Sequence, residues 1–559
     1  MTASTAALSR LHGFGARARL RAWPSLLVLV ASLLALPILV VVGFIFVPAG
    51  EVWKHLVDTV LADYVTNSLL LMLGVAFGTL IGGVGTAWLT SMCRFPGRGV
   101  FEWALLLPMA MPAYIIAYTY TGMLDFAGPV QTLIRDLSGW GWGDYWFPQI
   151  RSLPGAALML SLVLYPYVYL LSRAAFLSQS LCVLDVSRTL GNGPWRTFFR
   201  VALPLARPAI IAGLSLALME TLADYGTVEY FGVSTFTTGI FRTWFGLGNP
   251  AAAAQLSALL LGFVFALILL ERTSRGQARY HDTSQRQQSI RRLELSGWRG
   301  LAAFAFCLTP LSLGFLLPAG QLTVWSITVA DQRLDAEFAH LAFNSLGLAA
   351  GAALLALALA LLLGYGRRLL PTPLVRAAVR TAGMGYAVPG TVIAVGVMIP
   401  FAWLDNSVDS WMRATFGIST GLLLSGSLVA LIFAYLVRFL AVSLQTVESG
   451  LGKIRPSMDE AGRSMGLRPA QVLRRIHIPM LQGSLLTALL LVFVDVLKEL
   501  PATLILRPFN FNTLAVRAYE LASDERLADS GPAALSIVVA GLIPVIILSR
   551  SITRSRASV

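Results

Sequence analysis

Long apolar stretches alternate with short polar segments along most of this chain. Stretches of roughly 18 or more apolar residues, enough for a helix to cross about 30 Å of hydrocarbon, occur twelve times. They lie near residues 25–48, 67–91, 101–124, 156–176, 205–228 and 251–270, and again near 300–318, 344–366, 382–404, 421–443, 481–505 and 533–550. The pattern predicts an all-α polytopic membrane protein with about twelve transmembrane helices in two sets of six.

The two sets of six also repeat each other in sequence. The stretch LDVSRTLGNGPWRTFFRVALP, ending at Pro204, matches MDEAGRSMGLRPAQVLRRIHIP, ending at Pro479. A repeat at fixed spacing indicates duplicated architecture, and an even number of spans per copy makes the two repeats parallel. The matching pairs are Asp185 with Glu460, Gly191 with Gly466, and Pro204 with Pro479, each 275 residues apart, and Asn67 with Asn344 and Pro112 with Pro389, each 277 apart.

Charge placement predicts the domain organisation and the orientation. Arginine gathers at both ends of the chain and in alternate short loops, while the other loops are acidic or mixed, so both termini are expected to be cytoplasmic. We expect a cytoplasmic tail at 1–22, a first domain of six transmembrane helices at 23–270 and a second at 300–559. A basic cytoplasmic linker, 271–299, joins them. Each domain carries one repeated loop, named here the first repeated loop (182–206) and the second repeated loop (457–481).

Composition excludes most soluble functions. Of 559 residues, 56% are hydrophobic and only 13% are charged, which is too apolar for a soluble core. The net charge of +14 is explained by basic residues on one side of the membrane, so no nucleic-acid partner is expected. The first apolar stretch is long enough to serve as an anchor span, so we expect no cleaved signal peptide.

Catalytic and cofactor motifs do not emerge from the sequence. The three cysteines show no CxxC spacing and the five histidines are scattered, so we assign no metal site and no catalytic cluster. The stretch Gly450–Lys453 is a poor phosphate loop, because its first glycine is missing and Ile454 stands where Ser or Thr would bind magnesium. The chain is therefore expected to be a non-enzymatic subunit that carries no cofactor and does not itself hydrolyse ATP.

The two repeated loops are predicted to fold as helix, turn, helix. Gly191 and Gly466 suit the left-handed turn that ends a helix, and Pro194 and Pro469 suit the first position of the next one. The following helices are basic and amphipathic, which suits docking in a partner's groove. Packing on the chain's own bundle, or lying on the bilayer surface, is the alternative.

The repeated loops resemble the cytoplasmic loop signature of ABC importer permeases. The second loop carries Glu460-Ala461-Gly462 with Gly466 and Pro479, and the first carries a looser Asp185-Val186-Ser187 with Gly191 and Pro204. The resemblance implies a type I ABC importer permease fold with two copies of a partner ATPase that binds the ATP. It also implies that these residues couple the chain to the ATPase: Asp185, Gly191, Pro204, Glu460, Ala461, Gly466 and Pro479.

Two further stretches resemble fused ferric iron importer permeases of the bacterial inner membrane. They read TLADYGTVEYFGVSTFTTGIFRTWFG and KELPATLILRPFNFNTLAVRAYELASDE. The resemblance implies transport of ferric iron from a periplasmic ferric-iron-binding protein by alternating access. A permease for thiamine or another small solute with the same architecture is one alternative, and a secondary transporter with internal repeats is another.

Paired acids and their neighbouring loops are the candidate substrate and partner sites. Glu220 and Asp224 match Asp495 and Glu499, and the spacing of four predicts that each pair shares one helical face. Carboxylates at membrane depth usually face a pathway, and oxygen ligands suit a hard cation, so these acids are predicted to line the translocation path. The alternative pairs them with Lys498, Arg242 or Arg507. The loops that follow are predicted to contact the binding protein, or to re-enter and plug the path, through Phe236, Arg242, Phe511 and Arg517.

Overall fold

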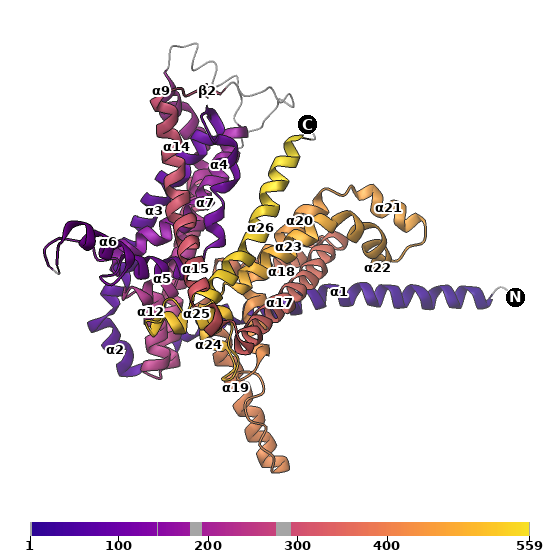
Figure 1. The fold of residues 1–559 in the computed structure, drawn as a ribbon. Helices are drawn as coiled ribbons and strands as arrows, with labels where there is room; N and C mark the ends of the chain where they lie inside the picture. The colour runs from indigo at the N-terminus through magenta and orange to yellow at the C-terminus, as the bar shows by residue number, and fades with distance from the viewer. Residues whose placement is uncertain (1–2, 142, 179–192, 276–291, 558–559) are drawn as a thin grey trace. The chain divides into compact units, whose positions relative to one another are not determined.

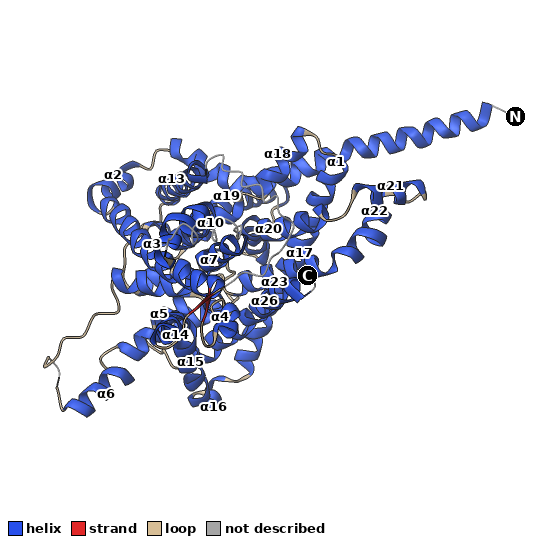
Figure 2. Cartoon of the chain, turned by 90° about the horizontal axis from the view of Figure 1, so that it is seen from above, coloured by secondary structure: helices blue, strands red, loops and turns tan. Residues whose placement is uncertain are grey.

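The computed structural model describes residues 3–141, 143–178, 193–275 and 292–557, and these residues are almost entirely helical (Figures 1 and 2). The described part also holds a short parallel strand pair, β1 (Cys93–Arg94) with β2 (Leu293–Glu294). The predicted all-α polytopic class is confirmed. Of the residues predicted to couple to an ATPase, Asp185 and Gly191 lie outside the described residues.

Ten helices in the described part are long and apolar enough to cross a membrane, and an eleventh span is counted if one bent helix pair is a single crossing. A shorter apolar helix, Gly531–Ile547, covers the last predicted stretch. Each of the twelve predicted stretches therefore has a helical counterpart. The bent pair, Arg98–Ala110 with Ala113–Ser138, turns by 91°. Pro112 stands at the break and is the N-cap residue of α5 (Ala113–Leu124), which fits a residue that has no backbone N–H and cannot continue a helix.

The chain forms two compact units, and each combines most of one repeat with terminal helices of the other. The first unit comprises Met1–Phe46 and Phe343–Phe511, and the second comprises Val47–Ala342 and Asn512–Val559. Within the first unit α1 (Ala3–Gly43) packs on α18 (Pro373–Ala382) and α19 (Gly390–Phe416). Within the second unit α26 (Gly531–Ala557) packs on α15 (Leu317–Thr328) and η2 (Leu107–Ala110). The boundaries predicted at 23–270 and 300–559 describe the duplication in sequence, whereas the compact units exchange their terminal helices.

The helices of the first unit follow in chain order, and α17 begins just before the unit boundary. They are α1 (Ala3–Gly43), η1 (Phe44–Phe46), α17 (Ala336–Leu369), α18 (Pro373–Ala382), η6 (Gly385–Ala387), α19 (Gly390–Phe416), α20 (Leu428–Gly452), α21 (Pro456–Ser464), α22 (Pro469–Val472), η7 (Leu473–His477), α23 (Ile478–Leu497) and α24 (Pro501–Leu506).

The second unit carries the remaining described helices. They are α2 (Gly50–Thr59), α3 (Leu61–Met92), α4 (Arg98–Ala104), η2 (Leu107–Ala110), α5, α6 (Pro129–Ser138), α7 (Leu153–Ser178), α9 (Pro194–Thr197), η3 (Phe198–Ala202), α10 (Leu203–Ala223), α11 (Gly226–Tyr230), α12 (Phe236–Phe241), η4 (Arg242–Gly246), α13 (Pro250–Arg275), α14 (Trp298–Leu311), η5 (Ser312–Leu316), α15 (Leu317–Thr328), α16 (Ala330–Arg333), α25 (Leu514–Ser523) and α26 (Gly531–Ala557).

Small residues set the closest helix contacts in each unit. In the second unit α3 lies against α7 so tightly that a Cβ on Gly74 would stand 2.8 Å from Ala157 Cβ, and one on Gly78 would stand 2.7 Å from Ser161 Cβ. In the first unit a Cβ on Gly396 of α19 would stand 2.8 Å from the carbonyl carbon of Pro37 in α1. Close backbone approach of this kind gains van der Waals contact, which drives helix association where lipid surrounds the helices.

Candidate functional site

The second repeated loop folds as a helix, a left-handed turn and a second helix, as predicted. Helix α21 ends in a turn in which Gly466 has φ +79°. The Gly466 N–H donates to Arg463 O at 2.9 Å and the Leu467 N–H donates to Gly462 O at 3.0 Å. These two bonds form a Schellman motif, which satisfies the last carbonyls of the helix. Pro469 then begins α22, so the sequence signals for the turn and the restart are both confirmed.

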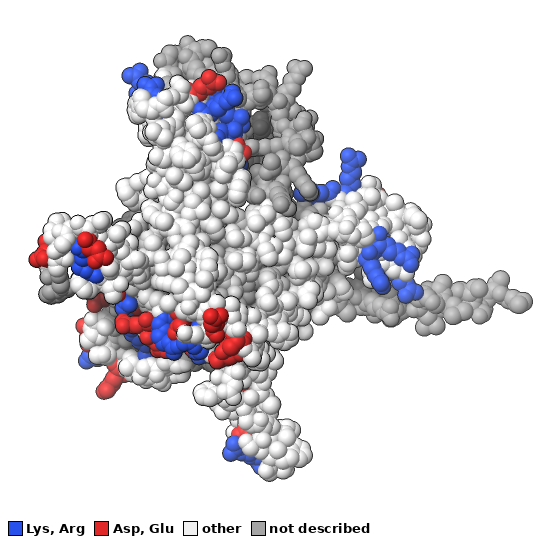
Figure 3. All heavy atoms as spheres, viewed as in Figure 1, with Lys and Arg blue, Asp and Glu red and all other residues white. Residues whose placement is uncertain are grey.

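The outward side of α21 is accessible and chemically mixed. Glu460, Ala461 and Gly466 are all exposed, and Met465 beside the turn is 79% exposed. Pro479, near the start of α23, is exposed as well. Figure 3 shows basic side chains gathered over α21 and α22, in contrast to the uncharged surface of most of the neighbouring helices. The loop therefore presents a carboxylate, a flexible methionine and several arginines, all free to meet a partner surface.

The inward side of α21 explains one departure from the family triplet. A Cβ added to Gly462 would stand 3.0 Å from Ile476 Cδ1 and 3.1 Å from Val472 Cγ2. Helices α21 and α22–η7 thus pack directly against each other at this position. A Cβ at this position would require the Ile476 and Val472 side chains to shift by a few tenths of an ångström, so a glycine suits this close contact.

The first repeated loop is described only from residue 193 onward. Its second helix, α9 with η3, is held by aromatic packing: the rings of Trp88 and Phe198 are 4.8 Å apart, and those of Trp88 and Phe176 are 5.5 Å apart. Trp195 is 74% exposed, and Phe199 and Pro204 are exposed too. The described part of this loop therefore has an apolar anchor, and its exposed side chains include Arg196 and Arg200 besides Trp195 and Phe199.

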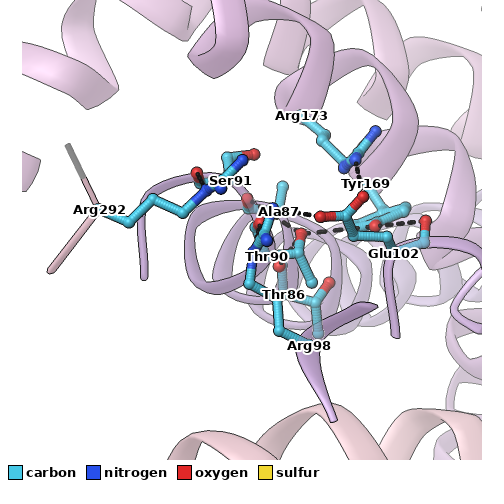
Figure 4. Close-up of polar contacts among 9 residues, drawn as sticks. All are labelled: Thr86, Ala87, Thr90, Ser91, Arg98, Glu102, Tyr169, Arg173 and Arg292. Carbon is cyan, nitrogen blue, oxygen red and sulfur yellow. Dashed lines mark hydrogen bonds and ion pairs between the residues drawn. The ribbon is translucent and has the colours of Figure 1, made fainter. Parts of the chain in front are cut away.

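A polar cluster links α4 to α7, the helix that leads into the first repeated loop (Figure 4). Glu102 forms ion pairs with Arg98 and with Arg173, the latter at 3.0 Å. The Tyr169 hydroxyl donates to Glu102 O at 3.0 Å, and Arg98 Nε donates to Thr90 O at 2.8 Å. Sequence reasoning missed this cluster. The sequence does contain a signal for it, since Glu102 and Arg173 each lie inside a predicted apolar stretch. Ionisable groups at membrane depth usually pair, so an ion pair between these two residues could have been predicted.

The paired acids do not share helical faces, and that prediction is wrong. Helix α10 ends at Ala223, so Asp224 has left the helix with ψ 135°, and α23 ends at Leu497, two residues before Glu499. In each pair the first acid is helical and the second is not. The second acid of each pair is therefore positioned by the chain that follows the helix, not by the helix itself.

Asp224 and Glu499 instead accept hydrogen bonds at the start of the next short helix. The Asp224 carboxylate accepts from the N–H groups of Thr227 and Val228, each at 3.1 Å, at the start of α11. Glu499 is buried, and it accepts from the N–H groups of Ala502 and Thr503, each at 3.0 Å, at the start of α24. Acids at helix N-termini satisfy unpaired N–H groups. The same local structure thus recurs in both repeats, 275 residues apart.

The ion partners of the acids match the alternative prediction in part. Glu499 pairs with Arg438 at 2.9 Å, and Asp495 pairs with Lys498 at 2.8 Å. Asp495 is half-buried, as is Glu220. Glu220 and Asp224 belong to one compact unit, and Asp495 and Glu499 belong to the other. A role for Glu220 and Asp495 in a translocation path stays a prediction.

The residues predicted to contact a binding protein fall in different environments. Phe236 is 1% exposed and packs on Phe263 with a centroid distance of 5.2 Å, so here it supports α12 from inside. Arg242 is exposed and pairs with Glu229 at 3.4 Å. Phe511 is half-buried, and Arg517 lies 3.6 Å from Glu337. Arg242 is the more exposed of the two arginines and Arg517 is half-buried, and a role of either in a partner contact stays a prediction.

Comparison with known proteins identifies the class. Residues 79–277 match the family described as "Binding-protein-dependent transport system inner membrane component". The chain is also 28% identical over 547 residues to the Fe(3+)-transport system permease protein FbpB 2 of Haemophilus influenzae, covering 94% of this chain and 98% of that protein. In sequence, this chain is similar to the inner-membrane permeases of binding-protein-dependent transport.

The permease also resembles relatives about as long as one of its repeats. It is 26% identical over 219 residues to the molybdenum transport system permease protein ModB of Escherichia coli, an alignment that covers 38% of this chain and 90% of ModB. A relative of that length fits one repeat. The matched family segment holds the first repeated loop, the aromatic anchor at Trp88 and the Asp224 cap.

Proposed function

We propose that the permease imports ferric iron, driven by a separate ATPase that docks on the repeated loops. The observation that carries the substrate is the similarity to a ferric iron permease over 94% of the chain, which includes both repeats and both sets of acids. The exposed face of α21 supports the docking, because it is a structured hairpin whose outer side chains are not used in internal packing.

Each repeated loop would seat in one of two ATPase copies. Glu460, Ala461 and Gly466 would form the contact in the second loop, with Asp185 and Gly191 in the equivalent places of the first. Pro204 and Pro479 would start the spans that carry the movement into the bundle. ATP would be bound by the partner subunits, so the permease itself would need no cofactor and catalyse no reaction.

The transport cycle would follow from the presence of two ATPase-docking loops on one chain. Closure of the ATPase pair on ATP would draw the repeated loops together, and the two repeats would rock so that the path opens first to one side and then to the other. Both termini and both loops would face the cytoplasm. The opposite side would receive a ferric-iron-binding protein, with Arg242 and Arg517 among the contacts.

Carboxylates favour a cationic cargo within this architecture. Glu220 and Asp495 occupy equivalent positions in the two repeats, half-buried near the ends of α10 and α23. Oxygen ligands suit a hard trivalent ion and would repel an oxyanion, so the acids support iron over an anionic substrate.

The test is reconstitution with defined partners. The permease is purified in detergent with its candidate ATPase, placed in liposomes, and supplied with binding protein in iron-loaded or iron-free form. Stimulation of ATP hydrolysis and iron uptake by the loaded form alone is the expected result. Stimulation by a binding protein loaded with molybdate or thiamine would refute the assignment of ferric iron as the substrate. Failure of the folded permease to bind any ATPase would refute the proposed docking.

A further inference from the structure

One turn of α17 holds both arms of the second repeated loop. Tyr365 and Arg368 stand three residues apart, close to the end of this helix at Leu369. The Tyr365 hydroxyl donates to the carbonyl of Pro469, the first residue of α22, at 2.8 Å. Arg368 Nε donates to Asp459 Oδ2 of α21 at 2.8 Å. A single helix end therefore touches the hairpin on both sides of the Gly466 turn.

The guanidinium of Arg368 joins three consecutive segments. Besides its bond to Asp459, Nη1 donates to Leu451 O at 2.5 Å, at the end of α20, and Nη2 donates to Ile454 O at 2.9 Å, in the turn before α21. Arg368 Nη2 also lies 2.7 Å from Asp459 Oδ2. The planar fork of arginine suits this arrangement, whereas a lysine has a single point of attachment.

The acceptor side of this contact is buried. The Asp459 side chain is 10% exposed, and its Oδ1 lies 2.6 Å from Nε2 of His477, whose side chain is fully buried. The His477 ring lies edge-on to Tyr365, with 5.3 Å between centroids. We name this set, Tyr365, Arg368, Asp459 and His477, the ionic clamp. The hydrogen bond from Arg368 to Asp459 is charged and largely shielded from water, so it restricts how α21 is held on the bundle.

The first repeat cannot build the same clamp. None of its four equivalent residues is ionisable, and the described part of its loop rests on the contact between Trp88 and Phe198. Counting back 277 residues from Tyr365 and Arg368, and 275 from Asp459 and His477, the equivalents are Trp88, Ser91, Leu184 and Ala202. The two loops therefore share a sequence signature, but the described part of the first loop is anchored by aromatic packing and the second loop by the ionic clamp.

We propose that Arg368, acting through Asp459, is the positioning residue that holds the second repeated loop in the orientation needed to transmit ATPase movement. The inference rests on the proposed docking of α21 on an ATPase. Arg368 touches neither partner nor cargo in this role. Its contribution is to keep α21 from moving independently of α17 and α20, so that displacement of the loop moves the bundle.

The test compares Arg368→Ala, Arg368→Lys and Asp459→Asn with the matched control Arg367→Ala. Arg367 is the adjacent residue on α17 and pairs with Glu448 at 2.8 Å, so its removal also breaks an ion pair but leaves the hairpin untouched. The measurements are ATPase binding in detergent, iron taken up per ATP hydrolysed in liposomes, and hydrogen exchange of peptides covering α21 and, for comparison, the middle of α20.

We expect Arg368→Ala and Asp459→Asn to retain ATPase binding but to lower uptake per ATP by about tenfold and to speed exchange in α21 but not in mid-α20. Arg368→Lys should fall between these variants and wild type, and Arg367→Ala should match wild type. The double variant Arg368→Ala, Asp459→Asn should be no worse than the poorer single variant, because both remove one link.

Three outcomes distinguish a failure of the proposed role of Arg368 from a failure of the proposed ATPase docking. Wild-type coupling and exchange in both Arg368→Lys and Asp459→Asn would overturn the clamp, even if Arg368→Ala proved too unstable to purify. An equal loss in Arg367→Ala would show general damage to α17 and would also overturn it. Failure of the wild-type permease to bind the ATPase would instead refute the proposed docking, while faster α21 exchange in the variants would still show that Arg368 holds the loop.

Discussion

Replacing Gly466 by valine should uncouple ATP hydrolysis from transport without unfolding the permease. Gly466 has φ +79°, and a Cβ placed there would meet no atom within 4 Å. Space is therefore not the obstacle, and the cost is confined to the backbone. For an L-residue the left-handed conformation costs about 1–2 kcal/mol, and β-branching makes it worse.

That cost falls on the hairpin itself. A penalty of about 1–2 kcal/mol lowers the population of the correct turn, relative to an open form, by a factor of roughly 5–30. The two bonds of the Schellman motif, at 2.9 and 3.0 Å, would be lost whenever the turn opens. Uptake per ATP should then fall, by at most this factor, because α21 would no longer move as one piece with α22 whenever the turn is open.

The assay measures ATP hydrolysis and iron uptake in the same liposomes, with loaded binding protein. Gly452→Val is the matched control: this glycine ends α20, has no positive φ, and also has no atom within 4 Å of an added Cβ. Gly466→Asn should retain more coupling than valine, since asparagine tolerates the left-handed region. Uptake per ATP at the wild-type level in Gly466→Val would refute the reasoning.

Three further outcomes follow from the packing and the acids. Glu499→Ala should lower the melting temperature sharply, since removing one partner of a buried ion pair costs about 3–5 kcal/mol, and an unchanged melting curve would contradict the capping role. Glu220→Gln and Asp495→Asn should reduce iron uptake at normal expression, and full uptake in both variants would exclude these acids from the path. Gly78→Leu should destabilise the α3–α7 contact by about 1–3 kcal/mol, whereas Gly262→Leu, with no atom within 4 Å of an added Cβ, should not; equal melting temperatures for the two would argue against close packing there.

Local signals in the sequence were sufficient for the spans, the duplication and the hairpin. Apolar length predicts a crossing helix because the bilayer sets the length that is needed. Gly466 and Pro469 predict the turn and the restart because their backbone constraints are intrinsic to the residues. Pro112 marks the break before α5 for the same reason, so this break could have been predicted from the sequence.

The acids show where local reading fails. A spacing of four implies a shared face only if the helix continues, and α23 ends before Glu499. That residue is held by Arg438, 61 residues away in sequence, as well as by the N–H groups of α24. Only the packing of α20 against α23 brings the arginine to it, so no pattern within the stretch itself could have predicted the outcome.

By itself, the sequence determined that this chain is a duplicated, many-helix membrane permease whose second repeated loop is a helical hairpin, because those features depend on hydrophobic length and backbone preference. The tertiary structure decided which helices share a unit. In lipid, one apolar helix face can replace another, so only close contacts such as that of Gly396 with Pro37 select the neighbouring helix. The tertiary structure also decided the ionic clamp, because Arg368 and Asp459 are 91 residues apart and meet only when α17, α20 and α21 pack together.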